Sequence, residues 1–143
     1  MIDKTKLDEL HNIREAGNKI DFNNYLNDFL TKYVKKNHNI EDYIGDYPSF
    51  IEPVYLGQNV EIGDDVLLGP NVFIGDNCKI GDYNEISNSI LLDNVKLGNL
   101  IILNNCIIIN NSQLKFENLS VDNCILMGTA ESKEELKIKR FED

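Results

Sequence analysis

The sequence predicts an all-β solenoid, a parallel β-helix of about four coils, preceded by a pair of helices. The first observation that predicts this class is that six consecutive six-residue units run from residue 56 to residue 91. The second is that each unit opens with Leu or Ile. A third observation is that Gly is the second residue in five of the six units. An α-helix would pay about 1 kcal/mol for each such Gly relative to Ala. A hexapeptide repeat is instead typical of a parallel β-helix.

Each unit is expected to form one short strand and one corner, so that three units close a coil. Residues about eighteen apart then stack at the strand spacing of ~4.8 Å. Gly, Asn and Asp are expected at the corners, where unusual backbone angles cost them least. Asn59, Asn71 and Asn77 occupy the fourth place of their units. The opening side chains are predicted to point inward as an aliphatic ladder: Leu56, Ile62, Leu68, Ile74 and Ile80.

The chain divides into three segments: a helical segment over 1–50, the β-helix over 51–130, and a charged C-terminal helix or tail over 131–143. A second helix is expected after Asp21, its candidate N-cap, with apolar residues at helical spacing from Phe22 to Val34. That apolar face needs a cover, which the first helix, the first coil or a partner subunit would supply. The charged end would protect the last coil, since solenoid ends expose unpaired edges.

Charge excludes two classes of partner. The net charge is −10, and residues 51–130 contain three lysines, Lys79, Lys96 and Lys115, against ten Asp and Glu residues. Nucleic acids and anionic membranes bind basic patches, so neither is expected as a partner. The apolar runs are too short to span a bilayer, and the N-terminus shows no apolar signal region. A cytoplasmic location is the expectation.

The cysteines and the corner carboxylates are the candidate ligand residues of the coils. Cys78 stands where other units place Val, and Cys106 and Cys124 are eighteen apart, so small buried residues on stacked coils are expected. Stacked carboxylates can hold a divalent ion, although turn geometry is the commoner reason for Asp at a corner. No metal site and no cofactor is predicted. The carboxylates in question are Asp64 and Asp82, one coil apart, with Asp65 and Asp76 at nearby corners.

The units above, together with residues 86–98 (ISNSILLDNVKLG) and 104–108 (NNCII), resemble the hexapeptide-repeat superfamily. The chain is most similar there to the C-terminal domains of sugar-phosphate nucleotidyltransferases, over about residues 52–128. The resemblance implies a left-handed coil. The same superfamily includes acyltransferases and γ-class carbonic anhydrases, so each chemistry can be tested against the residues present.

The sequence lacks the residues that each of these three enzyme classes usually employs for catalysis. The carbonic anhydrases bind zinc through three clustered His, whereas His11 and His38 both precede the coils. The acyltransferases commonly use a His base, and residues 39–143 contain no His; an Asp or Glu base stays open. Nucleotidyl transfer uses a Gly-rich phosphate loop on a preceding domain, and residues 1–50 contain only Gly17 and Gly45.

The sequence therefore favours a non-catalytic assembly or regulatory β-helix module of nucleotide-sugar metabolism, with no catalytic residue assigned and the binding residues unknown. A homo-oligomer, a trimer in preference, or a complex with a partner nucleotidyltransferase subunit is expected. The contacts would use the helix from Phe22 to Val34 and coil faces that carry Val54, Leu67, Phe73 and Leu91. The alternative is a hexapeptide acyltransferase that moves an acetyl group from acetyl-CoA to an amino sugar or nucleotide sugar with an atypical base.

Overall fold

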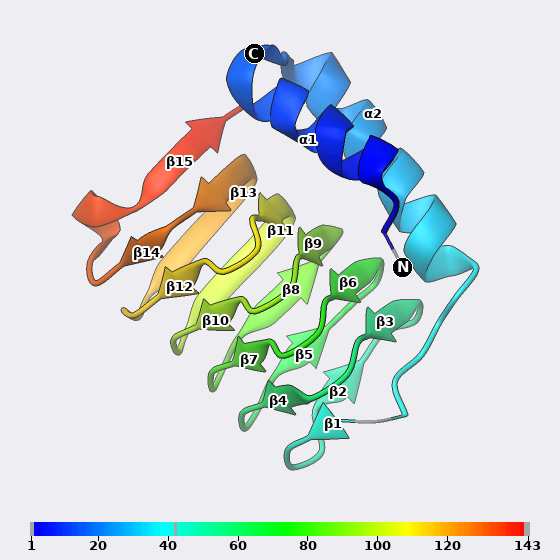
Figure 1. Cartoon of the computed structure of the whole chain (residues 1–143). Helices are drawn as coiled ribbons and strands as arrows, with labels where there is room; N and C mark the ends of the chain where they lie inside the picture. The colour runs from blue at the N-terminus through cyan, green and yellow to red at the C-terminus, as the bar shows by residue number, and fades with distance from the viewer. Residues whose placement is uncertain (1, 42, 142–143) are drawn as a thin grey trace.

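The computed structural model describes residues 2–41 and 43–141. Two helices, α1 (Lys4–Ala16) and α2 (Lys19–Leu30), precede a parallel β-solenoid of about five turns (Figure 1). A π-helical turn (Thr31–Lys35) extends α2 toward the first coil. Strands β1 (Tyr43–Ile44) and β2 (Ser49–Phe50) lie inside the range assigned above to the helical segment. The coils therefore begin earlier than the hexapeptide pattern does, and one more turn is present than that pattern predicted.

The strands form three flat faces, here named A, B and C. Face A stacks β1, β4 (Val60–Ile62), β7 (Lys79–Ile80), β10 (Lys96–Leu97), β12 (Gln113–Leu114) and β14 (Thr129–Ala130). Face B stacks β2, β5 (Leu67–Leu68), β8 (Glu85–Ser87) and the first halves of β11 (Ile101–Ile108) and β13 (Leu119–Met127). Face C stacks β3 (Val54–Leu56), β6 (Val72–Ile74), β9 (Ser89–Leu91) and the second halves of β11 and β13.

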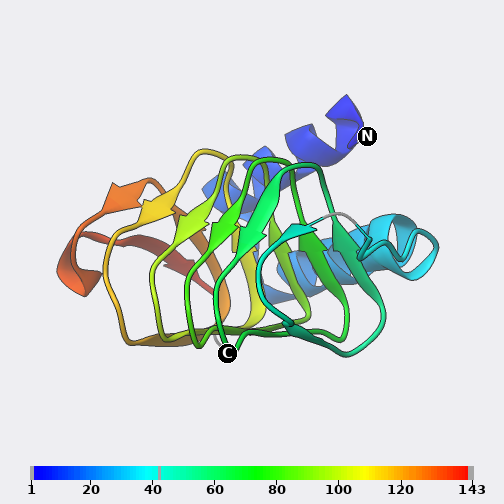
Figure 2. The ribbon, with the colours of Figure 1, turned by 90° about the horizontal axis from the view of Figure 1, so that it is seen from below.

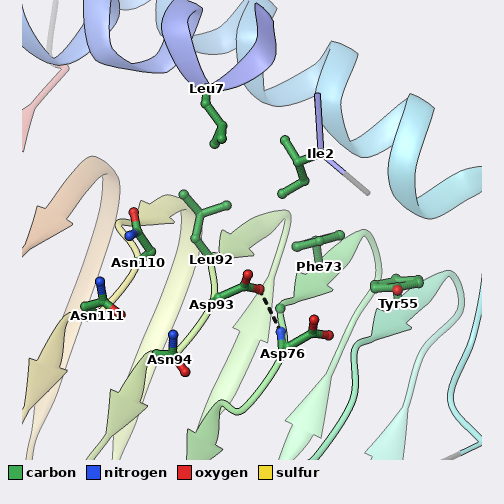
Figure 3. Close-up of a pocket in the computed structure, with 11 residues that line it drawn as sticks. Ile2, Leu7, Tyr55, Phe73, Asp76, Leu92, Asp93, Asn94, Asn110 and Asn111 are labelled. Atoms are coloured by element: carbon green, nitrogen blue, oxygen red, sulfur yellow. Dashed lines mark hydrogen bonds between the residues drawn. The ribbon is translucent and has the colours of Figure 1, made fainter. Parts of the chain in front are cut away.

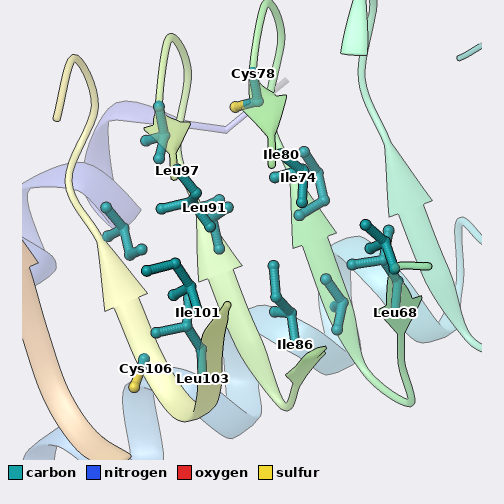
Figure 4. Close-up of a cluster of buried hydrophobic side chains, with 14 of the residues drawn as sticks. Leu68, Ile74, Cys78, Ile80, Ile86, Leu91, Leu97, Ile101, Leu103 and Cys106 are labelled. Atoms are coloured by element: carbon teal, nitrogen blue, oxygen red, sulfur yellow. The ribbon is translucent and has the colours of Figure 1, made fainter. Parts of the chain in front are cut away.

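The aliphatic ladder points inward as predicted. Leu68 and Ile74 are fully buried, and Ile62 is the most exposed of the five predicted ladder residues at 4%. Figure 4 shows Leu68, Ile74 and Ile80 of this ladder pointing into the space between the strands. Val54 and Leu91 belong to this core and are also fully buried, so the prediction that they lie on an outer coil face is wrong.

Where a coil has seventeen residues instead of eighteen, buried polar side chains form hydrogen bonds with the backbone of the neighbouring coil. The strand register is eighteen residues from Val54 to Val72 but seventeen from Val72 to Ser89. Asn84 is fully buried; its Oδ1 accepts the Ile101 N–H at 2.8 Å, and its Nδ2 donates to the Gly98 carbonyl at 3.1 Å. Ser89 Oγ accepts the Cys106 N–H in the same way. These side chains pair backbone groups that would otherwise be buried without a partner.

Gly at the second place of a unit serves close packing between coils. At Gly63 an added Cβ would lie 2.3 Å from Asp82 Oδ1 and 2.8 Å from the Gly81 carbonyl carbon of the next coil. Gly57 and Gly75 meet the next coil in the same way. None of these three glycines has a positive φ, so the expectation that corner glycines are there for unusual angles is wrong for them.

Face C is covered by the helices of the same chain (Figures 1 and 2). Phe22, Phe29 and Val34 are fully buried, so the apolar side of α2 is used within the chain and is not free for a partner subunit. Phe73 lies under this cover, 5.0 Å from Phe29 between ring centroids, rather than on an open coil face. The outward residues of face C that form this contact are Tyr55, Phe73, Ile90, Ile107 and Ile125.

The ends of the helices and of the solenoid are closed by specific contacts. Asn18, not Asp21, is the N-cap of α2; Asp21 is the third helical residue and completes a capping box with Asn18. After a short 3₁₀ turn (Lys133–Glu135), β15 (Lys137–Arg140) pairs antiparallel with β13. Phe141 then stacks on Phe22 at 4.4 Å between ring centroids, so the described C-terminal segment is a strand docked on α2 rather than a free tail. In the described ranges, no helix combines the length and apolarity needed to cross a bilayer.

Candidate functional site

At two of the three corners of the solenoid, every described non-glycine residue with positive φ is Asn. Corner BC, between faces B and C, has Asn71, Asn88, Asn105 and Asn123 at positive φ; corner CA, between faces C and A, has Asn59, Asn77, Asn94 and Asn111. Asn tolerates the left-handed region better than other residues with a side chain. Neighbouring amides also bond along the column, as Asn59 Nδ2 does to Asn77 Oδ1 at 3.2 Å. These corners are explained by turn geometry alone.

Corner AB, between faces A and B, is different. Its left-handed residues are Tyr47, Asp65, Tyr83, Leu100 and Asn118, with φ between 49° and 63°. Tyr47, Tyr83 and Leu100 are exposed by 92%, 55% and 42%. Bulky side chains are rare at positive φ, so this corner carries a conformational cost that the other two avoid.

The corner carboxylates are committed to holding the coils together. Asp82 Oδ1 accepts the Asp64 N–H at 2.9 Å, and Asp76 Oδ1 accepts the Gln58 N–H at 2.8 Å. Asp64 and Asp82 are stacked at corner AB, as their spacing predicted, with Asp65 beside them. Asp76 is at corner CA instead, so the four carboxylates do not converge. Among the described residues, no three His, Cys, Asp or Glu side chains are grouped to hold a metal ion.

The imidazoles and thiols occupy structural positions. His38 Nδ1 accepts the Val54 N–H at 3.0 Å, and its Nε2 lies 3.1 Å from Glu52 Oε1, at the entry to the coils. Cys106 and Cys124 stack inside the coil with their sulfur atoms 3.6 Å apart, as predicted. The hydrogen bond with Cys124 and burial raise the pKa of the Cys106 thiol. Burial raises the pKa of Cys78 to about 12, so neither thiol is an activated nucleophile.

A cavity of about 350 Å³ lies between the N-terminal helix and corner CA (Figure 3). Its apolar wall includes Tyr55, Phe73 and Leu92, and its polar rim includes Asp76 and Asp93. Burial and the Asp76 and Asp93 carboxylates raise the pKa of Tyr55, which keeps this hydroxyl protonated. Among the described residues that line the cavity there is no Lys, Arg or His. Its negative potential suits neither phosphates nor the carboxylates of acyl donors.

Faces A and B have no helix over them and present two different rows of side chains. The outward row of face A contains Glu61, Lys79 and Lys96, in register on stacked strands. The outward row of face B contains Leu67, Glu85 and Ile102, with Leu67 half-buried and Ile102 exposed by 43%. Leu67 is thus the one predicted surface residue of the coil faces that lies on an uncovered face.

Sequence reasoning missed Tyr83 and Leu100. Both stand at the fourth place of their units, where Asn59, Asn71 and Asn77 indicated that Asn is the ordinary choice. A bulky apolar residue at that place was the available signal. The structure shows that these two residues are stacked in consecutive coils at the corner farthest from the helices.

Comparison with known proteins identifies a family and similar solved structures. The sequence model of the GMPPB C-terminal domain family matches residues 50–141. No curated protein matches the chain. Among solved structures, a hexapeptide transferase family protein from Anaplasma phagocytophilum is similar with a TM-score of 0.31 and 17% sequence identity, over 73% of this chain and 70% of that one.

Proposed function

Because the chain belongs to the GMPPB C-terminal domain family, we propose that it is a non-catalytic assembly and regulatory β-helix module of the sugar-phosphate nucleotidyltransferase type. Its role would be to hold copies of itself, or a partner nucleotidyltransferase subunit, in a fixed arrangement within nucleotide-sugar metabolism. Face C and the helices give such a module a rigid back, which leaves faces A and B for contacts with other chains.

The observation that carries this proposal is the chemistry of the cavity at corner CA. An acyltransferase site needs a base that titrates near neutral pH and cations for the donor's phosphates. The described lining of this cavity provides carboxylates and amides instead, and Asp93 Oδ1 is occupied by the Asp76 N–H at 2.8 Å. A second cavity, between α1 and α2, is bordered by Glu9, Asp21 and Asp28 and is equally unsuited to anions.

Two measurements test the proposal. Calorimetric titration with acetyl-CoA at millimolar concentration is expected to show no saturable heat, and acyl transfer to UDP-linked amino sugars is expected to match the rate without protein. A known hexapeptide acyltransferase serves as the positive control for both. Turnover that is lost in Asp76→Asn or Asp93→Asn would establish the acyltransferase alternative and overturn the module.

The assembly role has its own test. A nucleotidyltransferase encoded by a neighbouring reading frame, if it carries a Gly-rich phosphate loop, would be co-expressed with this chain and its kinetics measured with and without it. A co-purifying complex with altered kcat or KM supports the regulatory role. Unchanged kinetics and independent elution would restrict the role to self-assembly.

A further inference from the structure

The cavity at corner CA is a space that the packing of the chain leaves unfilled. Leu7, Leu10 and Ile13 lie at helical spacing on one side of α1, but Leu10 and Ile13 are buried whereas Leu7 is exposed by 43%. Figure 3 shows Leu7 pointing from α1 toward corner CA, with Leu92 on the other side of the cavity. The buried side of α1 thus continues, at its first turn, over a hollow.

Polar contacts outside the cavity hold its roof in place. Asp3 is the N-cap of α1, and its Oδ2 accepts hydrogen bonds from Lys32 Nζ at 2.8 Å and from the Tyr33 hydroxyl at 3.3 Å. The Tyr25 hydroxyl donates to the Lys6 carbonyl at 2.8 Å. These bonds tie the first turn of α1 to α2 and to the π-helical turn. The hollow below Leu7 is therefore part of the folded chain.

The floor and the roof of the cavity are both apolar. On the coil side the rings of Tyr55 and Phe73 are stacked, with their centroids 5.0 Å apart and their planes at 10°, and Leu92 continues this surface. On the helix side are Ile2 and Leu7. Apolar surfaces on opposite sides favour a compact apolar group, which is removed from water by both. The volume of about 350 Å³ is near the lower end of the range for small-molecule pockets.

The rim of the cavity carries charge of one sign. Asp93 Oδ1 accepts the Asp76 N–H and Asp76 Oδ1 accepts the Gln58 N–H, both at 2.8 Å. Within the described chain, neither Oδ2 atom accepts a hydrogen bond. Burial, together with these two carboxylates, raises the pKa of Tyr55, so their negative field extends to the floor of the cavity. Each carboxylate has one oxygen committed to the fold and one open to a donor from outside the chain.

We propose that the cavity at corner CA binds a small amphipathic cation, a protonated primary amine on a compact apolar body. The apolar body lies between Leu7 and Phe73, and the ammonium group donates to the free oxygens of Asp76 and Asp93. A divalent metal ion is a poorer occupant, because it takes about six to eight oxygen ligands and gains nothing from apolar walls. This site goes beyond the assembly role and does not depend on it.

The test is titration of the native protein with amines of matched shape, followed by the chemical shifts of its backbone amides. 2-Phenylethylammonium and cyclohexylammonium are expected to shift the signals of Gly75, Asp76 and Asn94 saturably at millimolar concentration. 2-Phenylethanol and phenylacetate lack the positive charge, and methylammonium lacks the apolar body. Each of these three is expected to bind about tenfold more weakly or worse.

Asp93→Asn removes one charge but keeps the contact between coils, because an amide oxygen already plays this part where Asn99 Oδ1 accepts the Asp82 N–H at 2.8 Å. It is expected to weaken the binding of 2-phenylethylammonium about threefold to fivefold. Asp82→Asn, at corner AB, changes the net charge equally and should leave the affinity unchanged. Leu7→Asn should weaken binding about fivefold by making the roof polar, with His11→Asn, exposed one turn further along α1, as its control.

The inference is overturned if neither ammonium compound binds more tightly than its neutral or anionic counterpart. Binding that ignores both Asp93→Asn and Leu7→Asn would overturn it as well. Neither result bears on the module role, which turnover and complex formation test separately. Acyl transfer to 2-phenylethylammonium would refute the module role instead, while the cavity would stand as an amine site.

Discussion

The asparagine corners and corner AB turn the chain in the same left-handed conformation, but they do so with residues that differ in how well they tolerate it. Corners BC and CA flank the face that the helices cover, and apart from glycine every left-handed residue described in them is Asn. Corner AB faces away from the helices and has Tyr47, Tyr83 and Leu100 in that role. Turn geometry fully explains the first two corners. In the third, turn geometry alone does not explain the bulky side chains, which are exposed and have positive φ.

The three faces also differ, in the polarity of their outward side chains. Face C is apolar on both sides, because Phe73 and its neighbours in register meet α2 while the alternate residues fill the core. Faces A and B are apolar on the inside only and mixed on the outside. A face buried on both sides contributes most to the stability of the chain, and an uncovered face contributes mainly to specificity. Mutations on these surfaces should therefore have effects of different kinds.

The largest loss of stability is expected on face C. Phe73→Ala removes a 2%-exposed ring that contacts Phe29, Tyr33 and Tyr55, and should lower the free energy of unfolding by about 3–5 kcal/mol. Urea unfolding followed by far-UV circular dichroism measures it. Ile20→Ala on α2 is the control, because Ile20 is 69% exposed and should change stability by about 0.5 kcal/mol or less. Equal losses at both sites would mean that α2 does not hold face C.

The next largest loss is expected where corner AB meets a shortened coil. Asn84→Leu leaves the Ile101 N–H and the Gly98 carbonyl without partners in the interior, which should cost about 2–4 kcal/mol. Asn110→Leu, at an exposed position, is the control and should be nearly neutral. Thermal and urea unfolding of both variants give the comparison. A stable Asn84→Leu variant would show that the shortened coil closes without this side chain.

How far the sequence predicted these regions depends on whether a signal repeats locally. The inward ladder was predictable because the first place of each unit is Leu or Ile and the period of six fixes which way it points. The first coil was missed although Ile44, Gly45 and Phe50 keep the spacing of six from Leu56, because Pro48 and Pro53 give this stretch the composition of a turn-rich connection. The coil count was low for that reason.

The face assignments failed for a different reason. The sixth place of each of the first five units points outward, and successive sixth places fall on three different faces in turn. In the sixth unit the seventeen-residue coil shifts this place by one, so that Ile90 is outward and Leu91 is inward. Grouping the outward residues by strand register separates the apolar row of Tyr55, Phe73 and Ile90 from the charged row of Glu61, Lys79 and Lys96. Leu67, Phe73 and the inward Val54 and Leu91 were grouped by hydrophobicity alone, which cannot distinguish the core, the helix contact and an open face. That the helices of the same chain cover face C became clear only from the three-dimensional structure.

Exchanging residues between the two kinds of corner is expected to change the free energy of unfolding by a smaller amount. The two exchanges are expected to have opposite signs. Leu100→Asn should raise the stability of the isolated chain by about 0.5–1 kcal/mol, and Asn94→Leu should lower it by about 1–2 kcal/mol, because Asn tolerates the left-handed region better. Both are measured by urea unfolding followed by far-UV circular dichroism. Changes of the same sign would show that the corners do not differ in conformational cost.

The smallest effect on stability at neutral pH is expected for the three thiols. Each Cys directly follows an Asn of corner BC or CA, and each is buried in the coil. At pH 8 the native protein should react with a thiol reagent only as fast as it unfolds, whereas Tyr83→Cys, at an exposed place of corner AB, should react at once.

Burial raises the pKa of Cys78 from 9.0 to about 12, so the native state holds this proton more tightly than the unfolded chain does. The free energy of unfolding should therefore be unaffected below pH 9 and should fall as the pH rises from 9 toward 12, by at most about 1.4 kcal/mol per pH unit. Cys78→Val, the residue that neighbouring units place there, should show a shallower decline in melting temperature between pH 8 and pH 10; an identical decline would mean that Cys78 is not held protonated by the coil.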